Sequence, residues 1–379
     1  MKPALLLLLA ALPAGAVWDD PGGSTMHFLR LGAGARALGM AEAYGPVAAG
    51  ADAVYWNPAG LAKLTRPDFT YSHAEMLGLL RLEHLAYARP LQRWGGTWGV
   101  SATFFHQESI PLVTNANQRV GSFAPHGESV SIAYARHLIV GEDHPLRDRG
   151  FFQDLWRHPG AYEPLDHAAE PWTGSLALGG ALKFVSETIY DESAWAVAFD
   201  GGAHFRPVDL PELAMSATLR NLGTRPKFRE QQETLPLEGS LGAAIDLDMA
   251  KHRLIPAFEA AIPSYGKPYG KLGFEWSFPA ADGWRFALRG GYKTLTAVDL
   301  GPLSGLAGGI GLAGRRLSVD FAFQPMAALG EVYRASLGWR FDAAVYKGRP
   351  SRVRQRRGAR EPVRGPSGAV RVEPVRPRY

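Results

Sequence analysis

Charged residues recur at alternate positions within apolar segments, and these side chains have the greatest capacity for binding chemistry in the chain. Lys183, for example, is flanked by Leu182 and Phe184. Successive side chains of a β-strand point to opposite faces, so such charges share a face that the apolar residues leave free. The charges assigned to this inner face are Lys183, Asp200, Arg220, Glu259, Glu275, Arg285, Arg289, Asp320 and Arg334, together with Lys293 and Arg340.

These inner charges have two interpretations. They either line a path for a solute, or they cross-link a narrow interior as pairs of opposite sign. The second interpretation is favoured, because an unpaired buried charge is costly.

Catalytic, metal and cofactor chemistry find little support. The sequence holds no cysteine and no G-x-S-x-G motif, and no nucleophile, base and orienting group recur at a known catalytic spacing. His144, His158 and His167 are spaced like no compact zinc motif, and no acidic loop has EF-hand spacing. We therefore expect neither an enzyme nor a bound cofactor or metal ion.

The alternation predicts an all-β fold, a transmembrane antiparallel β-barrel of about fourteen strands. In the last strand, Tyr333, Leu337 and Trp339 share one face, while Arg334 and Ser336 share the other. One face of a barrel strand meets lipid and the other meets the lumen. The predicted strands lie near residues 67–74, 82–90, 95–105, 128–138, 174–186, 195–206, 212–221, 236–248, 253–263, 270–279, 284–294, 305–314, 316–326 and 331–341.

The links between strands alternate in length. Short turns follow even-numbered strands, and longer links, such as 106–127, 222–235 and 295–304, follow odd-numbered ones. Short periplasmic turns and longer outer loops produce this asymmetry. The segment 141–173 breaks the rule, and we interpret it as an insertion on the periplasmic side.

The two ends of the chain differ from the barrel region of residues 67–341. Residues 1–16 form a predicted signal peptide, with Lys2 before an apolar run and an Ala14-Gly15-Ala16 cleavage pattern. Residues 342–379 hold eleven Lys and Arg but three Asp and Glu, so this tail carries the positive charge of the chain. Its Pro, Gly and Arg content predicts disorder. Because the chain is exported, nucleic acid is not an expected partner.

Residues 17–66 carry two distinctive blocks, Phe28 to Met40 and Ala51 to Leu61, and are predicted to form an N-terminal hatch or plug. Small residues permit close backbone approach, and Asn-Pro initiates a turn. A phosphate-binding loop is excluded, because no strand and no Gly-Lys-Ser/Thr accompany the glycines. The hatch motif comprises Gly34, Arg36, Gly39, Met40, Asp52, Trp56, Asn57, Pro58, Ala59 and Gly60.

With these blocks, the chain resembles the PorV/PorQ family of outer-membrane proteins, a branch of the FadL-like barrel superfamily. The segments GARALGM and YWNPAGLAKL carry the resemblance, supported by LRNLG at 219–223, LPL at 235–237 and VDFAF at 319–323. The resemblance covers roughly residues 26–341. It implies a fourteen-stranded barrel with an N-terminal hatch and with the Asn57-Pro58-Ala59 turn inside the barrel mouth. Family barrels end on an aromatic residue that the barrel-assembly machinery recognises, whereas Phe341 here precedes a long tail.

Three functions follow for a protein of the cell outer membrane. The barrel takes up hydrophobic small molecules by a FadL-like route, or it serves type IX secretion by engaging secreted cargo, or it is a structural envelope protein. Uptake is placed slightly ahead. The expected partners are outer-membrane lipid, the barrel-assembly machinery and a hydrophobic ligand or cargo protein, which the apolar residues Ile110 to Val113 of an outer loop would contact.

Overall fold

The computed structural model describes residues 24–91, 95–139, 175–207, 209–249, 251–281 and 283–342. The predicted signal peptide, the insertion at 141–173 with its three histidines, and the tail after Asp342 lie outside the described residues. Among the described residues, no helix is both long enough and apolar enough to cross a bilayer.

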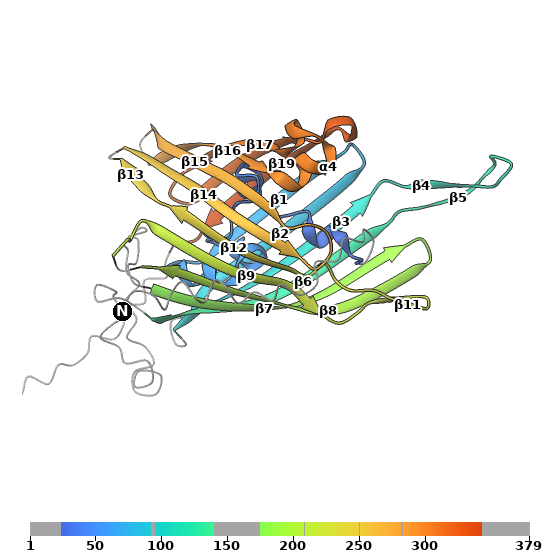
Figure 1. The fold of residues 1–379 in the computed structure, drawn as a ribbon, viewed down its shortest axis with the longest axis horizontal. Helices are drawn as coiled ribbons and strands as arrows, with labels where there is room; N and C mark the ends of the chain where they lie inside the picture. The colour runs from blue at the N-terminus through green and yellow to red at the C-terminus, as the bar shows by residue number, and fades with distance from the viewer. Residues whose placement is uncertain are drawn as a thin grey trace, which may run out of the picture. The chain divides into compact units, whose positions relative to one another are not determined.

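Within the described residues, fourteen antiparallel strands close into a barrel, as the alternation predicts (Figure 1). The first strand pairs with the last, with Asp68 opposite Arg340. The strands are β1 (Asp68–Met76), β2 (Leu80–Leu91), β3 (Gly96–Gln107), β6 (His126–Ile139), β7 (Ser175–Ile189), β8 (Glu192–Arg206), β9 (Leu213–Gly223), β12 (Glu238–Ile245) with β13 (Leu247–Met249), β14 (His252–Pro263), β15 (Tyr269–Ala281), β16 (Trp284–Lys293), β17 (Leu306–Ala313), β18 (Leu317–Pro325) and β19 (Glu331–Arg340).

One predicted strand, 236–248, is interrupted. Asp246 separates β12 from β13, and both parts pair with β14. The backbone N–H of Asp246 donates to Glu212 O, and its carboxylate accepts two hydrogen bonds from Arg253. These interactions hold Asp246 outside the ladder, so β12 and β13 act as one broken strand.

The links differ at the two ends of the barrel. Short turns at Gly95, Gly283 and Gly314 define what we call the turn end. The opposite end, called the link end, carries the hairpin of β4 (Ile110–Val113) and β5 (Arg119–Phe123), the pair β10 (Lys227–Phe228) and β11 (Gln231–Gln232), α4 (Thr294–Leu300), η3 (Pro302–Gly305) and η4 (Ala327–Leu329). The sequence predicted the long links after β3, β9 and β16 but not this secondary structure. It was wrong for the links after β1 and β7, which are tight turns because both pairs of strands extend further than expected.

The outer face of the barrel is apolar. In β15, Leu272 is 57% exposed, whereas the next residue inward, Lys271, is 0% exposed. Aromatic side chains cluster near both ends of the strands: the Tyr87 and Trp98 rings are 5.7 Å apart near the turn end, and the Phe323 and Tyr333 rings are 5.4 Å apart near the link end. An apolar band between aromatic girdles is the surface that an outer-membrane barrel presents to lipid. The chain is therefore a membrane-spanning barrel of the outer membrane.

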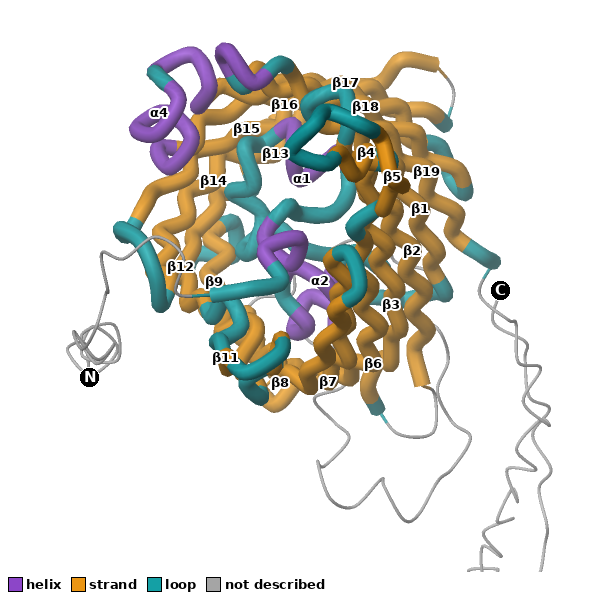
Figure 2. The backbone as a smooth tube through the Cα atoms, turned by 90° about the vertical axis from the view of Figure 1, so that its right-hand side faces the viewer, coloured by secondary structure: helices purple, strands orange, loops and turns teal. Residues whose placement is uncertain are grey.

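Residues 24–66, the N-terminal segment, lie inside the ring of strands (Figure 2). They form η1 (His27–Arg30), α1 (Ala35–Gly39), α2 (Ala53–Trp56) and η2 (Pro58–Lys63). Helix α1 contacts β16 to β19, and η2 contacts β3, β6, β7 and β8. The segment thus reaches opposite sides of the wall. Its function as a movable hatch stays a prediction.

Small side chains on the wall make room for this segment. Met40, Tyr55, Trp56 and Leu61 pack in one apolar cluster with inward alanines of β2, β6 and β7. Larger side chains at those positions would fill the space that the segment occupies. The core of the protein therefore lies between the wall and the N-terminal segment.

The outward register is tested by placing a charge among the lipid-facing residues. Phe321→Arg or Leu337→Arg is expected to lower the free energy of unfolding by about 2–4 kcal/mol if the position lies near mid-bilayer. Urea-induced unfolding in lipid vesicles measures this, with Phe321→Leu as the control. Stability equal to that of the wild type in both arginine variants would contradict the register.

Candidate functional site in the barrel interior

The predicted hatch motif meets the wall at glycines. A β-carbon at Gly179 would overlap the backbone of Pro58 and Ala59, and one at Gly202 would overlap the side chain of Asn57. On the other side of the barrel, Gly309 lies against Gly39. Glycine is required at these wall positions because the backbone of the segment approaches within the space of a side chain.

Asn57 fixes the bend between α2 and η2. It is 0% exposed, and its Nδ2 donates to Gly45 O and to Ala203 O, both at 3.2 Å. Its Oδ1 accepts from Ala59 N at 3.1 Å, while Pro58 occupies the first position of η2. An asparagine cap followed by proline is a favourable helix start. The Asn57-Pro58-Ala59 turn therefore lies inside the barrel, against β7 and β8.

The two sequence blocks of the segment are bonded to each other. Trp56 Nε1 donates to Ala33 O at 2.8 Å, and the Tyr55 hydroxyl donates to Leu29 O at 2.7 Å. Gly34 has a φ of +78°, a conformation that favours glycine, and a β-carbon there would touch Asp52. The residues named by the hatch motif thus hold a single folded unit.

The first charge cluster joins α1 to three strands. Arg36 donates twice to Glu275, at 2.7 and 2.8 Å, and Arg289 donates to the same carboxylate at 2.7 Å. Arg289 also donates to Asp320 at 2.7 Å. To reach Asp320 on β18, the Arg289 side chain crosses β17 at Gly311. A β-carbon at Gly311 would overlap both Arg289 and Asp320. This cluster attaches the segment to the β15–β18 side of the wall.

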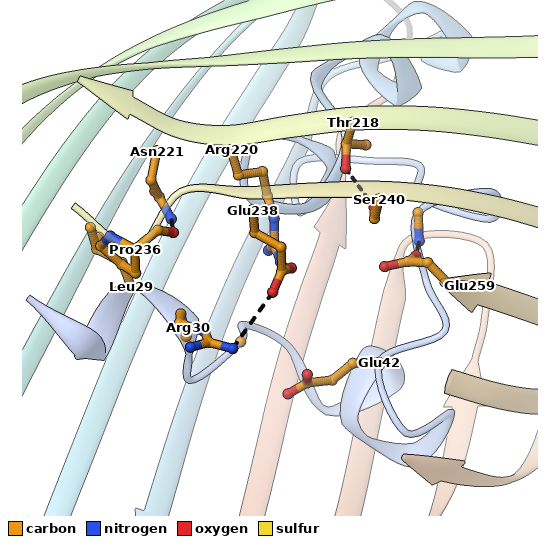
Figure 3. A network of polar contacts seen from close by, with 12 residues as sticks. Leu29, Arg30, Glu42, Thr218, Arg220, Asn221, Pro236, Glu238, Ser240 and Glu259 are labelled. Carbon is orange, nitrogen blue, oxygen red and sulfur yellow. Dashed lines mark hydrogen bonds and ion pairs between the residues drawn. The ribbon is translucent and has the colours of Figure 1, made fainter. Parts of the chain in front are cut away.

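A second cluster lies on β9, β12, β14 and β15, and Figure 3 shows its residues Arg220, Glu238 and Glu259. Lys271 Nζ donates to Glu259 at 2.8 Å, and Glu259 also accepts from Gly45 N of the segment at 2.8 Å. Arg220 forms an ion pair with Glu238, and the guanidinium of Arg30 in η1 lies 3.9 Å from the same carboxylate. Both ion pairs join residues directly opposite each other in the strand register.

A third cluster lies between β7, β8 and β9. Lys183 Nζ lies 2.8 Å from both Asp200 and the side-chain oxygen of Asn221. The backbone N–H of Asn221 donates to Asp200 at 2.7 Å, and Asn221 has a φ of +63°. The β8 to β9 register shifts between Phe199 and Gly201, next to this pair. The LRNLG block thus supplies one residue to each of two ion-pair clusters.

The remaining inner residues are bonded differently. Arg334 is 1% exposed and donates to Leu31 O of the segment at 2.8 Å, while Lys293 donates to Glu42 of the segment at 2.6 Å. Arg285 is exposed at the turn end and donates to Ser277 at 3.2 Å. Arg340 is exposed at the turn end too.

The structure therefore places all the predicted inner charges on the inward face and cross-links most of them. Sequence reasoning did not select Glu42, Glu238 or Lys271 as site residues. Lys271 was within reach of it, because the alternation that assigned Glu275 inward also assigns Lys271. Glu42 had no comparable signal, since it lies outside any strand.

One cavity of about 620 Å³ opens among these residues at the turn end. Gly283, Gly314 and Arg315 line its outer part, and the N-terminal segment contributes Tyr44, Asp52 and Lys63. Its walls come from nearly all sides of the barrel. We call this cavity the vestibule.

Comparison with solved structures finds chains of low sequence identity and partial structural similarity. The toluene transporter TbuX of Ralstonia pickettii is 11% identical with a TM-score of 0.49, covering 82% of this chain and 99% of that one. A FadL homologue of Pseudomonas aeruginosa is 11% identical with a TM-score of 0.46, covering 86% and 100%. The toluene transporter TodX of Pseudomonas putida is 10% identical with a TM-score of 0.47, covering 85% and 98%.

No family model and no curated protein matches the chain. The resemblance to the PorV/PorQ family therefore stays a prediction.

The pair of Lys271 and Glu259 offers a test of the cross-linked interior. Lys271→Met leaves Glu259 buried without its cation and is expected to cost about 3–5 kcal/mol of unfolding free energy. The double variant Lys271→Met/Glu259→Gln should lose less than the two single variants added together. Urea unfolding measures each variant, with exposed Lys267→Met as the control. Additive losses would show that the pair does not act as a unit.

Proposed function

We propose that the protein takes up small hydrophobic molecules through the barrel, with the N-terminal segment as the hatch. The observation that carries this proposal is the apolar contact between the segment and the wall at the link end. There Phe28, Leu29 and Leu38 pack against the strands, beside the ion pair of Arg220 with Glu238, while the vestibule lies at the turn end.

Two apolar clusters join the first part of the segment to the wall. Phe28 and Leu29 pack with Val185 of β7 and Leu235 of the β9–β12 link. Leu38 packs with further apolar residues of β1, β2, β18 and β19. A hydrophobic molecule arriving at the link end would exchange water for these surfaces, which is favourable in proportion to the apolar area buried.

The segment is held by contacts that can be broken and remade. Hydrogen bonds and ion pairs attach it to the wall, and among them are those of Ala35 N to Ser336 at 2.7 Å and of Arg36 to Glu275. A hydrophobic ligand that binds better to a displaced segment would shift the population toward that state. The proposal therefore requires movement of the segment during uptake.

A disulfide between the segment and the wall tests that movement. The variant Ala35→Cys/Ser336→Cys joins α1 to β19 in a chain that has no cysteine of its own. Uptake of tritiated toluene or oleate into proteoliposomes should fall to the level of protein-free vesicles when the disulfide is closed. Reduction should restore it.

The control for this lock is a disulfide within the wall. Thr188→Cys/Ser193→Cys joins β7 to β8 at the link end, where the two residues are opposite each other and lie outside the segment. Transport should be unchanged in this variant. Transport at the wild-type rate through the locked segment would overturn the hatch mechanism.

A second candidate function, engagement of a secreted cargo protein, is favoured by the exposed apolar side chains of the link end. The β4–β5 hairpin extends beyond the barrel wall (Figure 1) and leaves Val120 66% exposed. Val298 of α4 is 79% exposed at the same end. Apolar side chains that face water in this way are typical of protein-binding surfaces.

Removal of the hairpin separates the two functions. β4 and β5 pair only with each other, so replacing residues 109–124 by a short turn leaves the β3–β6 register intact. If the barrel handles cargo, exported proteins at the cell surface should decrease, as quantified by mass spectrometry, while hydrophobic uptake persists. A variant shortened at Lys227–Gln232 is the control. Unchanged export would contradict the cargo function.

A further inference from the structure

The charge balance of the vestibule is strongly uneven. Its lining includes nine Lys and Arg side chains but five Asp and Glu. Glu275, Asp320 and Asp246 are already engaged by Arg36, Arg289, Arg206 and Arg253. Three of the five carboxylates are therefore paired with arginines of the wall and segment, while Asp52 accepts a hydrogen bond from Thr70 and Asp68 accepts one from Ala51 N.

Five lining cations have no ion pair with a carboxylate in the described part of the chain. Lys63 donates only to Ala48 O, at 2.9 Å, and Arg285 donates only to Ser277. The full set is Lys63, Arg66, Arg285, Arg315 and Arg340. They come from the segment, from β16, from the β17–β18 turn and from β19, so they surround the cavity.

The environment of Lys63 shows the effect of this excess. Burial and the neighbouring Arg206 and Arg36 lower the pKa of its ammonium group well below the ordinary value. An anion beside Lys63 would stabilise its charged form. Cations gathered in a cavity with low-dielectric walls also concentrate anions from solution.

We infer that the vestibule is a binding site for small oxyanions, with guanidinium groups of Arg66 and Arg340 as principal donors. The ligand class is a carboxylate, phosphate or sulfate group small enough for a cavity of about 620 Å³. Arginine presents paired N–H donors that match such groups. This site goes beyond hydrophobic uptake and does not depend on it.

Asp52 gives the site a pH dependence. Burial, the largest cause, and the nearby Asp68 of β1 and Asp320 of β18 together raise the pKa of its carboxyl group to about 6. The hydrogen bond from Thr70, at 2.5 Å, and the charge of Arg36 act in the opposite direction. As the pH rises through about 6, Asp52 becomes charged and the vestibule becomes less positive, so anion affinity should fall.

The test is isothermal titration of the full barrel in nonionic detergent at low ionic strength. Sulfate is the first probe, because it stays doubly charged between pH 5 and 8 to a good approximation; phosphate and succinate are the second and third. The wild type should bind each probe saturably. Arg66→Gln/Arg340→Gln should weaken sulfate binding about tenfold or more, since hydrogen bonds to charged groups are the stronger class.

The matched control is Arg89→Gln/Arg316→Gln, which removes two positive charges near the same end but outside the cavity lining. Its affinity for sulfate should stay close to that of the wild type. Equal weakening in the two double variants, or no saturable binding by the wild type, would overturn the site. If Arg66→Gln/Arg340→Gln does not fold, Arg315→Gln on the exposed turn replaces it with the same expected direction.

Asp52→Asn tests the pH dependence separately. It should bind sulfate more tightly than the wild type at pH 7.5, and its affinity should change less between pH 7.5 and pH 5. An unaltered pH profile would remove Asp52 from the site. Because these titrations measure no transport, failure of the anion site leaves the uptake test unaffected.

Discussion

The structure depends on the need to pair every backbone N–H and C=O group that faces lipid. A bilayer offers no water to unpaired groups, so strands that span it must close into a ring. The pairing of Asp68 with Arg340 completes that closure. Closure then forces alternate side chains inward, and the interior must accommodate both their volume and their charge. The N-terminal segment and the three ion-pair clusters meet these two requirements.

Much of this architecture follows from the sequence because the period-2 pattern is local. Leu272, Phe274 and Trp276 alternate with Lys271 and Glu275, so strand, face and inward charge follow together. Which of these charges pair with each other does not follow from the local pattern. That Glu259 meets Lys271 follows from the register of β14 on β15, which alternation along one strand leaves open. The interruption at Asp246 is likewise hidden, because it depends on Arg253 of the next strand.

In the N-terminal segment, too, the local features follow from the sequence but the contacts with distant residues do not. Glycine, alanine and Asn-Pro predict close packing and a turn, and the structure has both at Asn57 to Ala59. Which wall residues receive them is a matter of three-dimensional fit: Gly179 and Gly202 lie more than a hundred residues later in the chain. The vestibule was not foreseen for the same reason, because its cations come from four separated parts of the sequence.

The diametric placement of the N-terminal segment has a mechanical consequence. α1 contacts β16 to β19 while η2 contacts β3 and β6 to β8, so one folded unit joins two opposite arcs of the ring. Interstrand hydrogen bonds fix the circumference of a barrel but resist flattening only weakly. A unit that is braced against both arcs, through glycines on each side, opposes that deformation. The cross-section of this barrel is therefore coupled to the position of its own N-terminal segment.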